Sequence, residues 1–568
     1  MIIRAKPRKG TDYYSVVTSI RSADKIREKT LLYIGRLDNL AEPKRMEIIK
    51  KLEDLSDPAL LKKFNSILIS LNYKFPSMIS SFEVEDVHNY GQELALHKVC
   101  EEIDFVNIIN RFTTKGGGPE LGKVVEAMVI NRNCDPCSYY QLQDWFSRSH
   151  LPFFLKLFPT ELTYSVSLNA LNYLQPENTI PMQVSLYENI TQAYHYKCER
   201  VDIDLTSTYF EGEECIMAEF GYPRGHSKDK LQIVIGFVVD QKGILVTHQV
   251  WQGNRTDSKS LKPMDRCIKK VFGIDAKIVV DRGMGTWENL KYMDRKNERY
   301  LVALKAGVKG TKLLKEIKTP RDEWIDVGDN QVAASVIQGR RKYVVVWNSS
   351  VARTNKKERD GNMKKAEDGL NKLLESVDKG DISSRSERDE KIGHIKRKYK
   401  VTRLIRTFGR KKGFCFTFKR TKLFKENEKY DGYQIFVTTE FDLNEKQVVE
   451  SYRTRDQIEK AIQTLKHILG LHPQNVRTKE HVLGNIFICA TAFQLRSILK
   501  MKLKDKNIDL SIEEAIKTLD RLKAVQIVVK SENEIQVQRK LTKMDADTRT
   551  LIEVFNMGDY NKLPDVEV

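Results

Sequence analysis

The sequence predicts an α/β protein in which a mixed β-sheet is flanked by helices and interrupted by a mainly β insertion. Three observations predict this fold. Three strand-like segments follow one another between residues 199 and 254, and a helix–strand–helix–strand pattern continues to about residue 308. Strand-like segments, a charged helix at about 356–377 and a strongly basic run occupy residues 309–432 before helical patterns return. The segments before residue 199 predict a basic β module followed by a helical region.

The length of the chain sets how many hydrophobic cores it needs. At 568 residues it is too long for one core, so its length alone predicts three or four domains. Hydrophobic residues make up 40% and aromatic residues 9%, which is ordinary for a globular protein. The changes of pattern predict six segments: a basic β/helical module at 1–75, a helical region at 76–198, the first part of the core at 199–308, a β-rich basic insertion at 309–432, the second part of the core at 433–505 and a helical C-terminal region at 506–568.

Positive charge is in excess and is concentrated in two stretches. The formal net charge is +19, which favours a polyanionic partner such as nucleic acid. Residues 1–36 hold nine basic and three acidic residues, a pattern typical either of a surface that binds the DNA backbone or of a solvated strand face. Residues 392–423 hold twelve basic residues and no acidic one, which indicates a surface that binds successive phosphates of a nucleic acid backbone. Six of these basic residues are the predicted DNA contacts: Lys396, Arg397, Lys398, Arg410, Lys411 and Lys412.

Several local patterns argue against other functions. The eight cysteines are scattered, which predicts a reducing compartment, and the pair Cys134 and Cys137 lacks the further ligands of a zinc site. The run GGGPELGK at 116–123 has the spacing of a phosphate loop, but Val124 stands where such a loop needs Ser or Thr. The opening residues lack the apolar segment of a signal peptide, and polar residues interrupt the apolar run at 482–499. We therefore expect a cytoplasmic protein without a membrane span, in which residues 482–499 form a buried helix.

Two aspartates lie on strands of the predicted sheet. In the strand that begins at residue 199, apolar residues at 201, 203 and 205 face one way, so Asp202 and Asp204 face the other. The apolar run 278–280 of a later strand ends at Asp281, and ligands of such sheets gather at strand ends. A carboxylate there can hold a metal, or it can cap the helix that begins near Trp287. Asp257 lies in a predicted loop and is expected to be structural.

The segment SYRTRDQIEKAIQTLKHILG at 451–470 is predicted to form one helix, because it is rich in good helix formers and has no internal Gly or Pro. At 3.6 residues per turn, four functional side chains share a stripe about 60° wide beside the apolar face: Tyr452, Arg455, Glu459 and Lys466. Arg455 and Glu459 form an i,i+4 pair, which on geometry alone is more often solvated helix decoration than a site. A carboxylate flanked by a tyrosine and two cations also suits a cleft that holds a metal against phosphates.

The spacing of these four residues resembles the glutamate-bearing motif of DDE transposases from bacterial insertion sequences. In that motif Tyr, Arg, Glu and Lys are separated by two, three and six residues, and this segment reproduces it without departure. The resemblance covers about residues 199–505 and implies an RNase H-like core with a mainly β insertion between the second Asp and the Glu. It favours Asp204 over Asp202, because the family's first Asp is often followed by x-Thr, and Leu205 and Thr206 follow here.

The resemblance implies a cut-and-paste DNA transposase that acts on the terminal inverted repeats of its own element. Its carboxylates would bind two Mg²⁺ ions, for which Mn²⁺ is expected to substitute. The cations of the motif would neutralise phosphates, and the tyrosine would orient one. The implied catalytic and metal-binding residues are Asp204, Asp281 and Glu459, and the implied DNA contacts of the motif are Tyr452, Arg455 and Lys466.

The resemblance also implies partners. These are double-stranded DNA of the inverted repeats, target DNA, and a second copy of the chain in a homodimeric synaptic complex, so a nucleoid-associated location is expected. The basic N-terminal β and helical modules would bind DNA ahead of the core. A hairpin on the element end would stack a flipped base on Trp324 or Trp347. Two alternatives stay open: a structure-specific nuclease that cuts without joining ends, and a DNA-binding protein without catalysis.

Overall fold

The structure is a computed structural model that describes residues 1–563 apart from 9, 23–24, 39, 56, 72, 74–80, 114–115, 212–214, 222–229, 305–307, 383, 410–414, 531–534, 559 and 562. The chain forms two compact units. The first comprises Met1–Val87, Val525–Lys540 and Leu563–Val568, and the second comprises His88–Ala524 and Leu541–Lys562.

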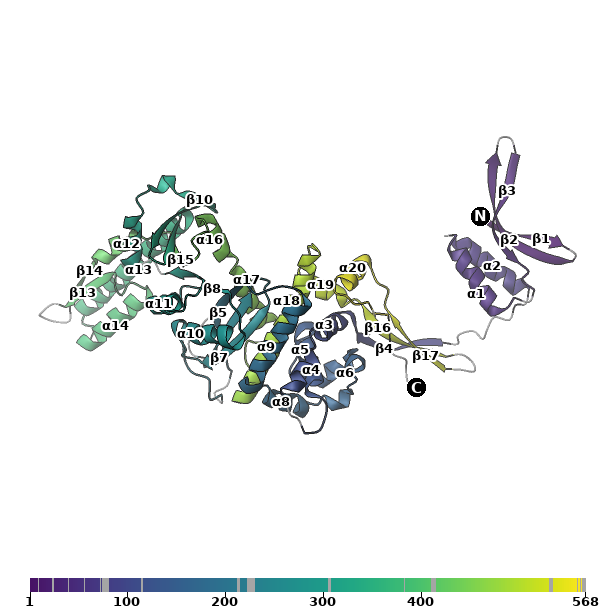
Figure 1. Cartoon of the computed structure of the whole chain (residues 1–568), viewed down its shortest axis with the longest axis horizontal. Helices are drawn as coiled ribbons and strands as arrows, with labels where there is room; N and C mark the ends of the chain where they lie inside the picture. Colours follow the sequence, from purple (N-terminus) through teal and green to yellow (C-terminus); the bar gives the residue numbers. More distant parts are fainter. Residues whose placement is uncertain are drawn as a thin grey trace. The chain divides into compact units, whose positions relative to one another are not determined.

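The first unit begins with three antiparallel strands in the order β1-β2-β3, which pack on two helices (Figure 1). Tyr14, Val16 and Ile34 from the strands meet Leu52 and Phe64 from the helices in one core. This agrees with the predicted β-then-helical order. A second sheet of this region has the order β17-β16-β4. The elements are β1 (Ile2–Arg8), β2 (Thr11–Ser22), β3 (Lys25–Gly35), α1 (Glu42–Glu53), α2 (Pro58–Ser70), β4 (Ser81–Asn89), β16 (Lys523–Lys530) and β17 (Ile535–Leu541).

Helices make up most of the predicted helical region 76–198 from residue 88 on, and α3, α5 and α8 pack against the long helix α18 (Lys479–Asp505). Strands β4, β16 and β17 lie in the segments 76–198 and 506–568, so the prediction that these segments are helical is wrong at these strands. Within the described ranges, α18 is the one helix long and apolar enough to cross a membrane, and its apolar window is entirely buried inside the protein. The predicted buried helix at 482–499 is therefore confirmed. The other helices are α3 (Gly91–Glu102), α4 (Phe105–Arg111), α5 (Leu121–Cys134), α6 (Leu142–Ser147), α7 (Leu151–Leu155), α8 (Tyr164–Tyr173), α9 (Pro176–Ala193), α19 (Ile512–Leu519) and α20 (Ala546–Val554).

A nine-stranded mixed sheet lies at the centre of the second unit, in the order β10-β11-β12-β15-β9-β8-β5-β6-β7. β5, β6 and β7 pair antiparallel, whereas β8 pairs parallel with both β5 and β9. The predicted three strands followed by helix, strand, helix and strand are confirmed. These elements are β5 (Arg200–Tyr209), β6 (Gln232–Asp240), β7 (Leu245–Gln252), α10 (Asp257–Arg266), β8 (Lys277–Val280), α11 (Trp287–Arg295) and β9 (Tyr300–Leu304).

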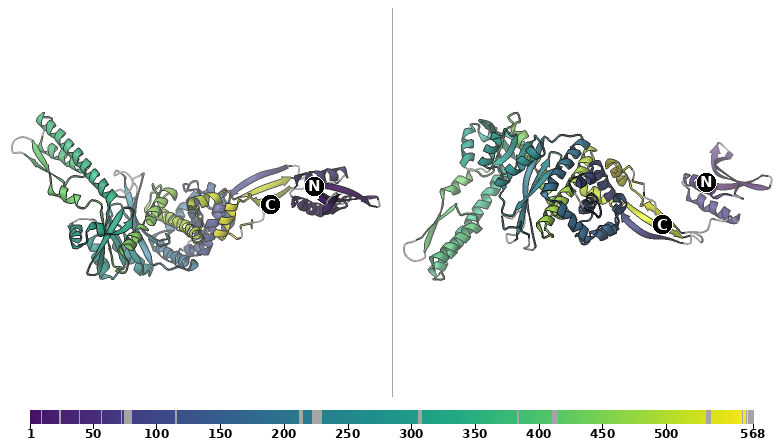
Figure 2. Two further views of the ribbon diagram at one scale, coloured as in Figure 1. Left: turned by 90° about the horizontal axis from the view of Figure 1, so that it is seen from above. Right: turned by 60° about the horizontal axis from the view of Figure 1, so that its bottom comes forward.

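The insertion is not mainly β, contrary to the prediction. Its first strands extend the central sheet, and its helices contain more residues than its strands. Helix α13 is 30 residues long, because its sequence contains no proline and places Met363, Leu370 and Val377 on one apolar stripe. Figure 2 shows α13 extending away from the sheet with the β13–β14 hairpin beside it. The elements are α12 (Val308–Glu316), β10 (Ile325–Gly328), β11 (Gln331–Gln338), β12 (Arg341–Asn348), α13 (Ser349–Asp378), α14 (Arg385–Lys398), β13 (Ile405–Gly409), β14 (Phe416–Arg420), α15 (Lys422–Glu428) and β15 (Tyr433–Thr438).

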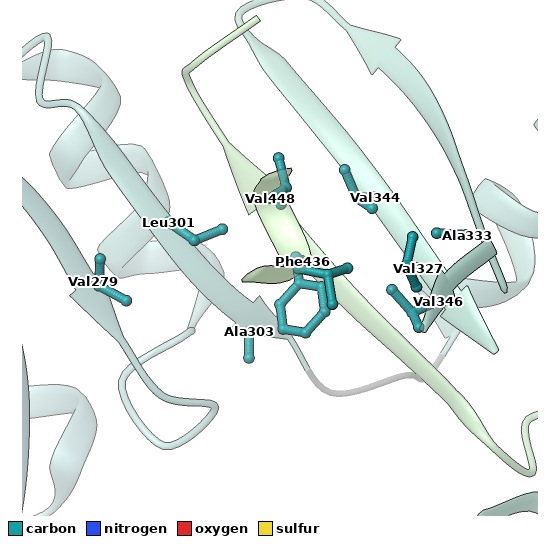
Figure 3. Packing of buried hydrophobic residues seen from close by; sticks show 10 residues of the cluster. Val279, Leu301, Ala303, Val327, Ala333, Val344, Val346, Phe436 and Val448 are labelled. Atoms are coloured by element: carbon teal, nitrogen blue, oxygen red, sulfur yellow. The ribbon is translucent and has the colours of Figure 1, made fainter. Parts of the chain in front are cut away.

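The strands of the insertion share a hydrophobic core with the central sheet (Figure 3). Val279 of β8 and Leu301 of β9 lie in one cluster with Val344 of β12 and Phe436 of β15. Helix α16 (Glu445–Arg453) adds Val448 to the same cluster. Because α16 directly precedes Arg455, this packing fixes the start of the segment that carries the predicted glutamate.

Candidate active site

Asp204 and Asp281 lie on neighbouring parallel strands at the point where β8 ends. The register of β5 and β8 places Asp202 opposite Val279 and Ile203 opposite Val280. One residue further along both strands, Asp204 and Asp281 follow as neighbours. Two carboxylates that are far apart in the sequence are therefore brought together by strand pairing.

Asp281 does not cap helix α11, so the capping alternative is wrong. Its Oδ1 accepts the N–H of Gly283 at 2.8 Å and that of Met284 at 3.3 Å, which closes the turn after β8. The N-cap of α11 is Thr286, whose hydroxyl accepts the N–H of Asn289 at 3.3 Å. The turn holds the Asp281 carboxylate at the strand end, beside Asp204.

The segment at 451–470 is not one helix, contrary to the prediction. Helix α16 ends at Arg453, α17 spans Asp456–Gln463, and a π-helical turn spans Thr464–Ile468. Arg200 of β5 donates to the Ser451 carbonyl at 2.6 Å and also to the Thr454 hydroxyl, which itself donates to that carbonyl at 2.9 Å. The carbonyl that a continuous helix would offer to the Arg455 N–H is therefore occupied, and this N–H donates to the Tyr452 carbonyl at 3.0 Å instead.

The break places the Arg455 guanidinium between two of the predicted carboxylates. Nη2 of Arg455 lies 3.0 Å from Oδ2 of Asp204, and Nη1 lies 3.0 Å from Oε1 of Glu459. Arg455 is 7% exposed, and its charge also acts on Asp281. The Glu459 side chain is 55% exposed, so it stands at the open edge of the group. The structure thus brings Asp204, Asp281 and Glu459 around one cation, and the pair with Glu459 is not mere surface decoration.

The electrostatics of Asp204 report how close these groups are. Burial is the main cause that raises the pKa of Asp204, Arg455 opposes the rise, and the charges of Asp281 and Glu459 add to it, so that the pKa reaches about 6. Asp281 and Glu459 act on the same carboxyl, so the three acids repel one another. A cation placed among them would relieve this repulsion.

Asp202, the alternative first carboxylate, has a different environment. It is 3% exposed and forms an ion pair with Nη2 of Arg200 at 2.7 Å. Burial raises the pKa of Asp202, whereas the charge of Arg200 lowers it. Because Arg200 also binds Ser451, Asp202 supports the backbone break before Arg455.

Tyr452 borders this group, since the Arg455 guanidinium lies 6.0 Å from its ring centroid, whereas Lys466 follows later in the segment. The Tyr452 ring packs on Phe436 with centroids 4.6 Å apart, and burial raises the pKa of its hydroxyl. Lys466 is 9% exposed and belongs to the π-helical turn. That turn holds more residues than an α-helical turn, so the single stripe predicted for a regular helix does not extend to Lys466.

The predicted DNA contacts of the insertion are only partly described. Lys396, Arg397 and Lys398 form the last turn of α14, where Arg397 and Lys398 are exposed and burial lowers the pKa of Lys396. Arg410, Lys411 and Lys412 lie outside the described residues.

The two predicted stacking residues, Trp324 and Trp347, lie near each other on the insertion side of the sheet. The Arg321 guanidinium lies 4.3 Å from the Trp347 ring centroid and 5.6 Å from that of Tyr433, and the Trp324 and Tyr433 centroids are 6.3 Å apart. Both tryptophans are half-buried. Sequence reasoning missed Arg321, Tyr433 and Arg200, because each acquires its neighbours only through long-range strand pairing.

The donor chemistry of the acidic group fits a hard divalent cation, since carboxylate oxygens are the preferred ligands of such ions. Among the residues that the structure describes, no set of three or more His, Cys, Asp or Glu side chains is already gathered in metal-binding geometry. The guanidinium of Arg455 accounts for this, because it separates Asp204 from Glu459. The site therefore fits a metal in charge and ligand type, with the Arg455 guanidinium between two of its carboxylates.

Comparison with known proteins places the chain in a family. No curated protein matches it. A solved structure, the cryo-EM structure of a piggyBac transposase synaptic complex with hairpin DNA, aligns over 85% of this chain and 87% of its own, at 11% identity and a TM-score of 0.37. The family model of the transposase DDE domain matches residues 198–495, a range that includes the three carboxylates and the Tyr-Arg-Glu-Lys segment. The chain therefore belongs to the transposase DDE domain family.

Proposed function

We propose that the protein is the transposase of a bacterial insertion sequence of the Tyr-Arg-Glu-Lys class, which binds terminal inverted repeats and catalyses metal-dependent DNA cleavage and strand transfer in a cut-and-paste reaction. The observation that carries the proposal is the convergence of Asp204, Asp281 and Glu459 around Arg455. The motif spacing and the family match add independent support.

The strand order supports an RNase H-like core. Numbered along the chain, β5 to β9 are the first to fifth strands of this core, and across the sheet they lie in the order 3-2-1-4-5. β5, β6 and β7 pair antiparallel, whereas β8 and β9 run parallel to β5. This arrangement supports Asp204 on the first strand and Asp281 at the end of the fourth as the first two catalytic acids.

Asp204, Asp281 and Glu459 would hold two Mg²⁺ ions, with Mn²⁺ as a substitute. When bound, the ions would activate a water or 3′-hydroxyl and stabilise the leaving oxygen of the phosphodiester. The backbone turn at Gly283 and Met284 holds Asp281 in place. The exposed Glu459 side chain has room to rotate toward the other two carboxylates.

The cations and the tyrosine of the motif would act on the DNA strand. Once Arg455 leaves Asp204 and Glu459, its guanidinium can bind a phosphate with two parallel hydrogen bonds. Lys466 would neutralise a second phosphate, and Tyr452, anchored on Phe436, would orient one through its hydroxyl. Arg455 therefore exchanges a carboxylate partner for a phosphate partner.

The insertion and a second protomer would complete the DNA complex. The exposed end of α14 and the basic residues at 410–412 would bind the DNA backbone. Trp324 and Trp347 would stack a flipped base of a hairpin end, since Trp347 lies beside the Arg321 guanidinium and Trp324 beside the Tyr433 ring. We propose a homodimeric synaptic complex that acts on element ends and target DNA at the nucleoid.

One assay with cleaved element ends, supercoiled target DNA and Mg²⁺ tests this proposal. Joined product is the expected result. Cuts without joining would identify a structure-specific nuclease, and DNA retention without cutting would identify a catalytically inactive binder. Inverted repeats that bracket the reading frame would supply the DNA ends for the assay.

A further inference from the structure

The N-terminal sheet has two chemically different faces. Ile3, Val16 and Leu32 stand in register across β1, β2 and β3, and all three pack against the core formed with α1 and α2. Side chains alternate along a strand, so the neighbours of Ile3 project from the opposite face.

The opposite face carries a row of cations. Arg4, Lys6 and Arg8 occupy alternate positions of β1, and all three are exposed. At the rise of an extended strand they recur about every 7 Å. The intervening positions hold Ile3, Ala5 and Pro7, so the positive charge is confined to one face of the strand.

Tyrosines stand beside these cations. The register places Ser15 between Arg4 and Tyr33 and sets Tyr13 opposite Lys6. Tyr33 is 64% exposed although it lies within β3. Ser15 is small and 7% exposed, so the longer side chains of the outer strands project beyond the centre of the face.

Most of the positive charge on this face is not compensated within the protein. Glu28 forms an ion pair with Arg4. Within the described parts of the chain, neither Lys6 nor Arg8 forms an ion pair. Regularly spaced cations, two of the three without acidic partners, beside the exposed ring of Tyr33 and the half-buried ring of Tyr13 suit an extended polyanion rather than a folded acidic protein.

We propose that this face, formed by Arg4, Lys6, Arg8, Tyr13 and Tyr33, binds in the major groove of duplex DNA and reads the element end. The inference rests on the proposed transposase function. The B-DNA major groove is about 12 Å wide and admits β-ribbons, and the outer strands of a three-stranded sheet are about 10 Å apart. The narrow, deep major groove of duplex RNA would exclude the sheet. The cations hold phosphates, and the tyrosines contact base edges.

Binding measurements on the full chain test the phosphate contacts. The double variant Lys6→Ala/Arg8→Ala is compared with Lys62→Ala/Lys63→Ala, which removes the same charge from exposed positions of α2. The probes are a short duplex from the DNA flanking the reading frame and a shuffled duplex of equal composition. We expect the first variant to bind both duplexes more weakly and to reduce the slope of log affinity against log salt by about 2. The control variant should match the wild type.

The variant Tyr33→Ala tests sequence reading separately. It should lose the preference for the flanking duplex over the shuffled one while the salt slope stays unchanged, and Tyr33→Phe should retain part of the preference. If Lys6→Ala/Arg8→Ala binds like its control while the wild type still cuts element ends with Mg²⁺, this inference fails alone. A wild type that neither binds nor cuts overturns the proposed function as well.

Discussion

Two groups of carboxylates in the second unit differ in how their charges are compensated. In the helical region, Glu126 is 1% exposed and lies 2.6 Å from Nδ1 of His97, and Glu93 is fully buried and accepts the N–H of His150 at 3.0 Å. Each of these acids meets a nearby partner of its own. At the sheet, Asp204 and Glu459 share the single cation Arg455.

The comparison shows that burial alone does not mark a site. Burial raises the pKa of Glu93 and Glu126 as it does that of Asp204. The difference is that the negative charges of Asp281 and Glu459, which come from distant segments, also raise the pKa of Asp204. Like charges gathered at a strand end oppose folding and favour a bound cation, whereas isolated buried acids serve packing.

Asp281→Ala should abolish the chemistry, with at least a ~10³-fold loss of cleavage rate, because it removes a ligand of the metal ions. DNA affinity should stay near the wild-type value in gel retardation, and calorimetry should show only a small fall in melting temperature as the turn after β8 loses its carboxylate acceptor. Asp275→Asn is a matched control, because Asp275 is 84% exposed and precedes β8. Comparable loss of binding and activity in Asp281→Ala would mean that Asp281 holds the fold.

Arg455→Ala should slow cleavage by roughly 10²-fold, since one charged phosphate contact is lost. Arg455 holds the pKa of Asp204 down, so its removal should also move the acid limb of the pH–rate profile to higher pH. Arg455→Lys should restore the position of the acid limb more fully than the cleavage rate. The lysine ammonium supplies the positive charge but lacks the planar pair of donors with which a guanidinium binds a phosphate. An unchanged profile in Arg455→Ala would contradict the observed pairing.

The pH dependence of stability should report the raised pKa of Asp204. The folded state holds this proton more tightly than the unfolded state, since burial raises the pKa from 3.8 to about 6. Stability from this group is therefore fully present below pH 4 and is lost as pH rises through 6, by about 2–3 kcal/mol without divalent ions. Urea unfolding of Asp204→Asn should lack this part of the slope. Parallel curves for variant and wild type would refute the assignment.

Glu126→Ala should lower the free energy of unfolding by about 2 kcal/mol, because it leaves His97 without its buried partner. Cleavage per folded molecule should not change at a temperature well below melting. A selective loss of activity with normal stability would contradict the conclusion that Glu126 serves packing rather than catalysis.

Asp202→Asn should have the smallest effect, a loss of about 1 kcal/mol of stability as the charge-assisted bond to Arg200 weakens. The cleavage rate should stay within a few-fold of the wild type. A loss as large as that of Asp281→Ala would make Asp202, rather than Asp204, the first catalytic acid.

The sequence predicted features that depend on local periodicity. Strand alternation and an apolar run identified the strands that carry Asp204 and Asp281, and both strands are present as predicted. The break before Arg455 was not predictable, because it depends on Arg200, which is 251 residues away from Ser451. The extension of the sheet by β10–β12 depends on non-local pairing with β15 for the same reason. The catalytic roles themselves stay predictions.

The most direct test of the account is anomalous diffraction from Mn²⁺ in crystals of the protein bound to cleaved element-end DNA. The account predicts Mn²⁺ peaks contacted by carboxylate oxygens of Asp204, Asp281 and Glu459, with Arg455 turned to a DNA phosphate. Mn²⁺ bound elsewhere, with Arg455 still paired to Asp204 and Glu459 beside bound DNA, would contradict it.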